Sequence, residues 1–361
     1  MANRWLKAIS TTFATRATLI RGLYQEDHMR ALLDRERARS DRTGVVFSLL
    51  IYTCSGHNRE AQLRALVRLL RRRIRATDEA GWLDGGRLGV LLLDAPHAGA
   101  SRVAEDVLVN WPAGLPQPAC EICTYPSNSS VGESTRERQP AERKEITVGG
   151  QPEHALETLF ARELPAWKRS LDVVGAGTAI VALSPLLALA ALSIKLTSRG
   201  PVFFAQQRAG LGGRPFTMYK LRTMVVDAET RKEELRARSE QDGPAFKLKD
   251  DPRITTIGRW LRKTSIDELP QFWNILRGEM SLVGPRPLPL DESNRCRGWH
   301  RRRLEVTPGL TCIWQVRGRS QVTFVEWMRM DLRYVRSRGL WHDLKLIALT
   351  VPAVVLRKGA R

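Results

Sequence analysis

The sequence predicts an α/β protein in two parts: a front α+β domain and a small mixed α/β domain at the rear, which begins with a membrane segment. Three observations carry this prediction. Helix and strand patterns alternate at the front, a Ser-, Gly-, Pro- and Arg-rich stretch without apolar periodicity follows, and a long apolar run opens the rear part. The length of 361 residues suffices for two domains of ordinary size. We place an amphipathic N-terminal helix at 1–26, the front domain at 27–125, a linker at 126–165 and the rear domain at 166–361.

The front domain is predicted to contain a strand, a helix, two strands, a helix and a strand, in that order. The strands and helices are expected at 45–52, 60–75, 81–83, 88–93, 98–109 and 120–125, with a hairpin turn at Asp84-Gly85-Gly86. A βαββαβ order predicts one sheet covered by helices on one face. Cys120 and Cys123 form a lone CxxC without a second pair, so a strand is the simpler interpretation than a metal site.

The apolar run at 171–196 is long enough to cross a bilayer core, which takes roughly 20 apolar residues. Ser184-Pro185 stands at its middle, where proline removes a backbone donor and kinks or breaks a helix. Positive residues flank both ends, and such residues favour the cytoplasmic side. These features predict a re-entrant helix, over about 168–197, that turns at Ser184-Pro185 and leaves by the face it entered. A kinked spanning helix and a buried core helix are the alternatives.

The net charge of +20 calls for a polyanionic partner. Nucleic-acid-binding motifs are absent from the sequence, so we expect no nucleic acid partner. Beside a membrane segment, anionic membrane lipids and phosphorylated substrates explain the charge better. A last apolar stretch at 344–356 is too short to span and is predicted to be an amphipathic helix at the interface or in the core.

The rear domain gathers cations around one adjacent carboxylate pair, Asp267-Glu268. Arginine holds phosphate oxygens in bidentate fashion, and a carboxylate can coordinate Mg²⁺ or attack phosphorus. The pattern therefore predicts a diphosphate site with a bound Mg²⁺. The candidate phosphate-binding residues are Arg208 in a Gly-rich loop, Lys220 and Arg222 on one strand face, Arg262, and Arg286 in a rigid turn.

Each of these signals also has a structural interpretation. Asp267 and Glu268 suit the first turn of a helix, and Pro270 fits there as well. A helix N-terminus would also keep Asp267 ionised at neutral pH, as a nucleophile requires, so the two interpretations are compatible. Lys220 and Arg222 would otherwise be a solvated strand face, and Gly284-Pro285-Arg286-Pro287 only a turn.

The series of motifs resembles the bacterial sugar transferases known as monotopic phosphoglycosyl transferases. The resemblance covers about 167–361 and rests on QxRxG (206–210), KxRTM (220–224), DPRIT (251–255), RxxxxDELPQ (262–271), SLVGPRP (281–287) and PGLT (308–311). It implies a monotopic enzyme on the cytoplasmic face of the bacterial inner membrane. Such an enzyme transfers a sugar 1-phosphate from a UDP-sugar to undecaprenyl phosphate and releases UMP. The reaction starts assembly of an exopolysaccharide, O-antigen, capsule or glycoconjugate.

Residue by residue, the resemblance makes Asp267 the nucleophile, forming an aspartyl-phosphosugar, and Glu268 its partner. The pair also becomes the Mg²⁺ site, and Lys220, Arg262 and Arg286 contact phosphate. Cys312 departs from the glycine expected after PGLT, which concerns local packing. A membrane-docked regulatory or binding protein with an inactive transferase domain is the alternative function.

The front domain resembles a degenerate GGDEF-like domain, a ferredoxin-like α+β fold. The Asp84-Gly85-Gly86 hairpin lacks the acidic pair of that family, so cyclase activity is not expected. Arg75 and Asp78 match the spacing of that family's inhibitory RxxD nucleotide site. Alternatively, Asp78 caps a turn and Arg75 is solvated, and the domain serves as a scaffold, a partner site or the contact of a homodimer.

Overall fold

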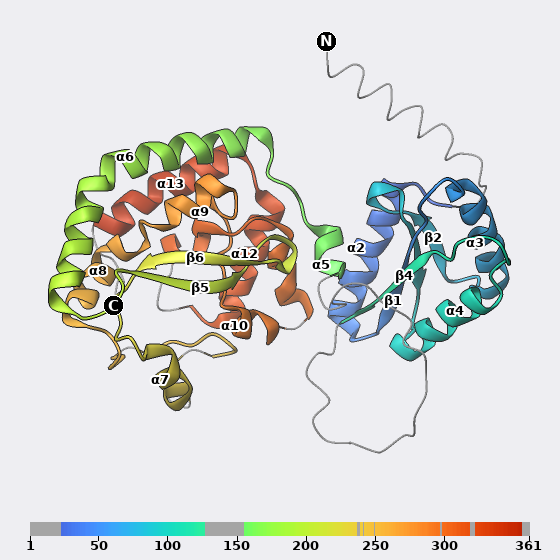
Figure 1. Ribbon diagram of the computed structural model, residues 1–361, viewed down its shortest axis with the longest axis horizontal. Helices are drawn as coiled ribbons and strands as arrows, with labels where there is room; N and C mark the ends of the chain where they lie inside the picture. Colours follow the sequence, from blue (N-terminus) through green and yellow to red (C-terminus); the bar gives the residue numbers. More distant parts are fainter. Residues whose placement is uncertain are drawn as a thin grey trace, which may run out of the picture. The chain divides into compact units, whose positions relative to one another are not determined.

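The computed structural model describes residues 23–126, 155–236, 239–240, 242–248, 250–296, 298–317 and 322–355 (Figure 1). The chain divides into two compact units, Met1–Ala155 and Leu156–Arg361. The predicted N-terminal helix and most of the predicted linker lie outside the described residues. Each unit is considered by itself below.

The first unit contains a four-stranded antiparallel sheet with the strand order β2-β3-β1-β4. This is the order of the ferredoxin-like βαββαβ fold, so the predicted topology is confirmed. Its elements are α2 (Glu26–Thr43), β1 (Phe47–Thr53), α3 (Arg59–Arg73), β2 (Glu79–Trp82), β3 (Leu88–Leu92), α4 (His97–Val109) and β4 (Ala119–Tyr125).

The expectation that helices cover one face of this sheet was wrong, because α2 covers the second face. Leu50 and Tyr52 pack with residues of α3 and α4. The alternate residues of β1, among them Leu49, are also buried, and Tyr125 on this second face donates its hydroxyl to Asp41 of α2 (2.5 Å). Helix α2 is rich in charged residues, which hides its short apolar stripe in the sequence.

The second unit combines short strands with many helices, as predicted. Strands β5 and β6 form an antiparallel hairpin, and β7 and β8 pair in parallel. Its elements are α5 (Ala155–Phe160), α6 (Ala166–Thr197), β5 (Phe203–Ala209), β6 (Pro215–Leu221), α7 (Ala228–Leu235), α8 (Thr256–Thr264), α9 (Gln271–Arg277), β7 (Ser281–Val283), α10 (Leu290–Asn294), β8 (Gly309–Thr311), α11 (Ile313–Arg317), α12 (Phe324–Ser337) and α13 (Leu340–Val355).

The end of the predicted linker is part of this second unit. Glu157 of α5 pairs with Arg301 (2.6 Å), and Arg162 donates its backbone N–H to the carbonyl of Glu305 (2.7 Å). Leu159 and Phe160 are buried. The rear domain therefore begins near residue 156 rather than at 166.

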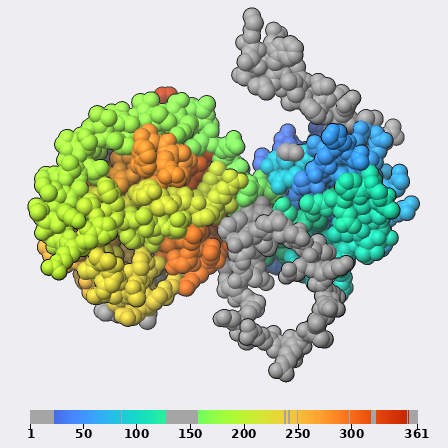
Figure 2. Space-filling model, viewed as in Figure 1, coloured from blue at the N-terminus to red at the C-terminus, as the bar shows by residue number. Residues whose placement is uncertain are grey.

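Helix α6 runs continuously through Pro185, so the predicted break is a bend without interruption of the helix. Pro185 has no N–H for the carbonyl of Val181, and the Ser184 hydroxyl donates to that carbonyl instead (2.9 Å). The helix curves around the unit, and its atoms form a long strip of surface (Figures 1 and 2).

Both halves of α6 pack on the same unit. Ala176 lies in a cluster with Phe216 and Ile275, whereas Ala190 and Ile194 pack against residues such as Leu261. Within the described residues, α6 is the one helix long and apolar enough to cross a membrane, and 11% of its apolar window is buried. That fraction contradicts the alternative of a buried core helix.

The first turns of α6 are tied to β7 and α13 by buried polar groups. The ammonium of Lys168, 1% exposed, donates to the carbonyl of Val283 (2.9 Å) and pairs with Asp343 of α13. Asp172 accepts hydrogen bonds from the Ser281 hydroxyl (2.9 Å) and from the backbone N–H of Leu282 (2.8 Å). Helix α6 therefore fixes β7 in place.

Candidate active site

Three segments bring Lys220, Glu268 and Arg286 together. Lys220 stands near the end of β6, Glu268 on a 3₁₀ turn at Ile266–Glu268, and Arg286 in the turn after β7. Arg286 forms a two-point ion pair with Glu268: its Nη1 lies 3.3 Å from Oε2, and its Nη2 contacts Oε1. The Lys220 ammonium lies 3.6 Å from Oε1 of the same carboxylate. The predicted clustering of these residues is seen in the structure.

The turn that carries Arg286 is held by close backbone contact. A Cβ at Gly284 would lie 2.5 Å from the carbonyl oxygen of Thr307, and one at Gly309 would lie 2.0 Å from the N of Gly284. Arg303 donates to the carbonyl of Arg286, and its Nε donates to buried Asp331 (2.9 Å). These contacts fix the direction in which Arg286 leaves the backbone.

Arg262 is positioned by helix α8, which packs tightly on the KxRTM segment. Thr255 caps the helix by accepting from the N–H of Gly258 (3.0 Å). A Cβ at Gly258 would lie 2.0 Å from the carbonyl oxygen of Thr223. At this short separation, Arg262 Nε donates to the Thr223 hydroxyl (2.9 Å).

The two carboxyls of the pair experience opposite effects. Burial opposes ionisation of Glu268, but Arg286 and Lys220 outweigh it and lower the pKa of Glu268 to about 2. Burial, together with the neighbouring Glu268 charge, raises the pKa of Asp267 to about 6. Asp267 is thus ionised at neutral pH, as predicted, but its pKa is raised by burial. The predicted position in the first turn of a helix was wrong, because Asp267 lies on the 3₁₀ turn Ile266–Glu268 and α9 begins only at Gln271.

Asp267 is also the member of the pair whose carboxylate has no hydrogen bond or ion pair within the described part of the chain. It is 7% exposed. The fields of Lys220, Arg262 and Arg286 reach it and favour its ionised form. A buried, ionised carboxylate without a partner, next to three cations, is available to a substrate.

Arg208 joins this cluster, although it lies on β5 and not in the predicted Gly-rich loop, whereas Arg222 does not join it. Arg208 donates to the carbonyl of Pro287 (2.8 Å), and burial, then the charge of Arg286, lowers its pKa to about 10. Strand β6 ends at Leu221, so Arg222 does not share a strand face with Lys220. Its guanidinium donates to the carbonyl (3.0 Å) and hydroxyl (2.7 Å) of Ser198 at the end of α6. The predicted shared face was wrong for this reason.

The donor set fits Mg²⁺ only together with substrate oxygens. No group of three His, Cys, Asp or Glu side chains with metal-binding geometry occurs among the described residues. Both oxygens of Glu268 already face Arg286 and Lys220, which leaves Asp267 as the open carboxylate. Mg²⁺ commonly uses one or two carboxylates plus substrate phosphates and water, and this arrangement matches that habit.

The model of one protein family, described as "Bacterial sugar transferase", matches residues 164–357. That match covers more than half of the chain. The chain belongs to the bacterial sugar transferase family. The matched residues of this chain contain all the motifs from Arg208 to Arg286 discussed above.

Named relatives resemble the part of the chain that the family model matches. The chain is 45% identical over 203 residues to a UDP-glucose:undecaprenyl-phosphate glucose-1-phosphate transferase of Caulobacter vibrioides, and this match covers 54% of the chain and 71% of the relative. It is 44% identical over 195 residues to the galactosyl transferase CpsE of Streptococcus agalactiae, and 43% over 198 residues to the UDP-galactose-lipid carrier transferase of Erwinia amylovora. Each of these two matches covers 54% of this chain. The chain spans 43% of the length of the Streptococcus agalactiae relative and 41% of that of the Erwinia amylovora relative.

The similarity of the chain to solved structures is weak. A DGC protein from Thermotoga maritima is 17% identical, with a TM-score of 0.26, covering 29% of this chain and 82% of that one. At these values the GGDEF-like resemblance of the first unit stays a prediction. In the first unit of this chain, the Asp78 carboxylate accepts from the backbone N–H groups of Arg75 (2.8 Å) and Leu93 (3.3 Å), as the turn-capping alternative expects.

The sequence did not indicate which residues hold the cluster around Asp267 in shape. Thr223 lies within the KxRTM motif, and its hydroxyl beside two cations, Lys220 and Arg222, could have suggested a role. Arg303 and Asp331 stand far apart in sequence, and nothing in their local patterns connects them. Cys312 is 2% exposed and its thiol lies 2.9 Å from Gln315 Oε1, in line with the predicted effect on local packing.

Proposed function

We propose that this bacterial sugar transferase moves a sugar 1-phosphate from a UDP-sugar to undecaprenyl phosphate, releases UMP and so starts assembly of a bacterial surface glycan. One observation carries the proposal. Glu268 is held by Arg286 and Lys220, while the adjacent Asp267 carboxylate is buried, ionised at neutral pH and free of partners among the described residues. The names of the relatives support the substrate classes.

In the first step, the Asp267 carboxylate oxygen attacks the phosphorus that bears the sugar. The bond from this phosphorus to the bridging oxygen breaks, and UMP leaves with the electron pair, giving an aspartyl-phosphosugar. In the second step, a phosphate oxygen of undecaprenyl phosphate attacks the same phosphorus. The bond to Asp267 then breaks, the carboxylate is restored, and a diphosphate-linked sugar forms on the lipid.

Charge stabilisation supplies most of the assistance in phosphoryl transfer. Lys220, Arg262 and Arg286 surround Asp267 and would hold the diphosphate oxygens during the attack. Glu268 positions Arg286 and Lys220 and prevents them from pairing with the nucleophile. Mg²⁺ bound by Asp267 and the substrate phosphates would neutralise part of the diphosphate charge.

We propose that α6 enters the cytoplasmic leaflet of the bacterial inner membrane and returns, which makes the protein monotopic. Both halves of α6 pack against one folded unit, so its two ends stay with the same body. Its outer face exposes apolar side chains such as Val174, Val181 and Leu196. The net charge of +20 favours an anionic leaflet.

The test is a UMP-release assay with undecaprenyl phosphate and a panel of UDP-sugars. Wild-type protein should release UMP from at least one sugar in a lipid-dependent manner, and folded Asp267→Asn protein should not. Absence of lipid-dependent release across the panel from correctly inserted wild-type protein would refute the proposed activity and favour a regulatory role.

A further inference from the structure

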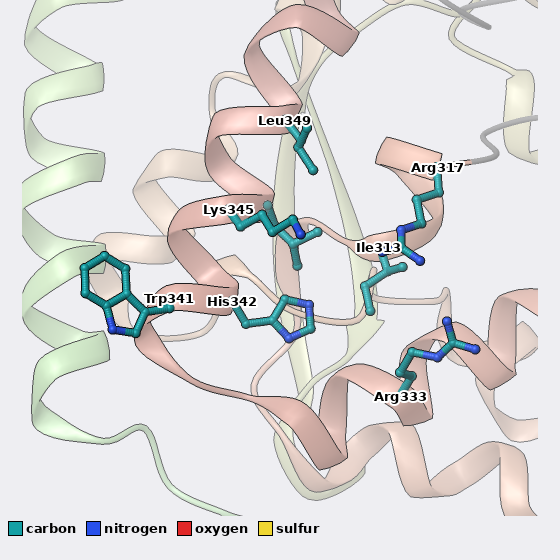
Figure 3. Close-up of a pocket in the computed structure, with 8 residues that line it drawn as sticks. Ile313, Arg317, Arg333, Trp341, His342, Lys345 and Leu349 are labelled. Atoms are coloured by element: carbon teal, nitrogen blue, oxygen red, sulfur yellow. The ribbon is translucent and has the colours of Figure 1, made fainter.

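A groove lies between α11, α12 and α13, and its lining residues are not those of the cluster around Asp267. Its volume is about 390 Å³. Ile313, Leu346 and Leu349 supply apolar wall, and Arg317, Arg333 and Lys345 supply charge from α11, α12 and α13 respectively. Figure 3 shows the side chains of Arg317 and Lys345 directed toward Ile313, and that of Arg333 extending from α12 toward the side of Arg317. We refer to it as the C-terminal groove.

The positive charge of the C-terminal groove is not neutralised within the described residues. No ion pair or hydrogen bond there involves the side chain of Arg317, Arg333 or Lys345, and Arg333 accepts only at its backbone carbonyl, from the Ser337 hydroxyl. An adjoining cavity of about 140 Å³ contains Glu326, but that carboxylate caps α12 by accepting from the N–H (3.0 Å) and hydroxyl (3.1 Å) of Thr323. Three cations from three helices therefore face one space without a counter-ion.

The groove borders an apolar surface on α13. Trp341 is 82% exposed, and Leu340, Leu344 and Leu349 are each about 36–42% exposed. Tryptophan concentrates at the boundary between membrane and water, and amphipathic helices lie there with their apolar face in the lipid. With α6 in the leaflet, this surface suits the headgroup level of the same membrane.

We propose that the C-terminal groove binds an anionic phospholipid, with its phosphate among Arg317, Arg333 and Lys345 and an acyl chain along Leu346 and Leu349. Guanidinium and ammonium groups match phosphate oxygens. A free phosphate ion would leave the apolar wall unused, so the observations favour a lipid. The inference rests on the proposed membrane placement but not on the transfer chemistry, because none of these residues belongs to the cluster around Asp267.

The experiment measures which lipid stays on the full-length protein. Protein reconstituted in nanodiscs of phosphatidylcholine with a minor fraction of phosphatidylglycerol is released into mild detergent, and retained lipids are counted by native mass spectrometry. Wild-type protein should retain one phosphatidylglycerol severalfold above its share of the mixture. The double variant Arg333→Gln/Lys345→Gln should lose this enrichment. Arg317→Gln alone, at an exposed helix end, should reduce it and serves if the double variant does not fold.

The matched control is Arg214→Gln/Arg336→Gln, which removes the same charge from two exposed positions outside the groove. It should retain phosphatidylglycerol like the wild type. Equal enrichment in the groove variant, or equal loss in the control, would overturn the proposal, because either result assigns retention to overall charge. Displacement of the retained lipid by undecaprenyl phosphate would overturn it too, since the groove would then hold the acceptor. UMP release is measured separately, so failure of this site leaves the proposed activity standing.

Discussion

Asp267 and Glu268 are separated by one peptide bond, yet their side chains have different tasks. Glu268 faces Arg286 and Lys220 and has a pKa of about 2, so it stays charged at every physiological pH. Burial, together with that charge, raises the pKa of Asp267 to about 6. The sequence could show the pair and its cations, but not which carboxyl the cations would grip, because this depends on the direction of the chain through the 3₁₀ turn.

Replacing Asp267 with asparagine should abolish turnover and the trapping of radiolabelled phosphosugar on the protein. A neutral amide cannot serve as the attacking oxygen, and its size leaves the site intact. The measurements are UMP release and protein-bound label after a quench. Near-wild-type release by a folded Asp267→Asn protein would eliminate the proposed covalent mechanism.

Activity should follow a bell-shaped dependence on pH, with limbs near 6 and near 8. The ionised form of Asp267 reacts, so activity rises as pH increases through about 6. Burial, then the charge of Arg286, lowers the pKa of Lys220 to about 8, so its ammonium is lost as pH rises further. The profile of kcat/KM in wild-type protein checks both limbs.

Glu268→Gln should move the acidic limb to lower pH. Removal of the Glu268 charge ends its repulsion of Asp267 and releases Arg286 and Lys220 to stabilise the Asp267 anion. Both effects lower the pKa of Asp267. An acidic limb that stays in place in this variant would show that another group controls it.

Arg286→Lys should impair activity although the charge is kept. Lysine cannot grip Glu268 with two nitrogens as Arg286 does, nor hold phosphate in bidentate fashion. We expect a loss in kcat/KM of about 1–3 kcal/mol, the range for charge-assisted hydrogen bonds, or on the order of 10- to 100-fold. Full activity of the lysine variant would assign this turn a structural role only.

At the scale of elements, period and turn chemistry predicted most of the first unit. The strand at 45–52 and the helix at 60–75 correspond to β1 (Phe47–Thr53) and α3 (Arg59–Arg73) within two residues at each end. Helix α2 was not predicted because its few apolar residues stand among many charged ones. In the second unit, Arg222 was misplaced because alternation in sequence says nothing about where a strand ends.

The contact between α8 and the KxRTM segment makes a sharp prediction. Gly258→Ala should lower stability by about 1–3 kcal/mol, the usual effect of overpacking, since the added methyl group meets the Thr223 carbonyl at 2.0 Å. It should also reduce activity by moving Arg262. Thermal unfolding of detergent-solubilised protein measures the first effect. Gly177→Ala is the control, because nothing lies within 4 Å of its added Cβ; equal effects of the two substitutions would contradict this account.

At the scale of the whole molecule, a re-entrant α6 keeps the chain before and after it on one side of the membrane. Single cysteines at Glu163 and Arg214, both exposed, should resist a membrane-impermeant thiol reagent in intact cells after the native cysteines are replaced. Both should react once the cells are opened. Labelling of the Glu163 site alone from outside would show a spanning helix.

The buried pair of Lys168 and Asp343 has a consequence for how the protein is made. The lysine stands in the first turn of α6 and its partner in α13, 175 positions later. Until the ribosome has delivered Asp343, the ammonium lacks its ion-pair partner, and an unpaired buried charge strongly opposes folding. We therefore expect a chain that a premature stop codon ends before Asp343 to leave this unit incompletely folded and sensitive to proteases.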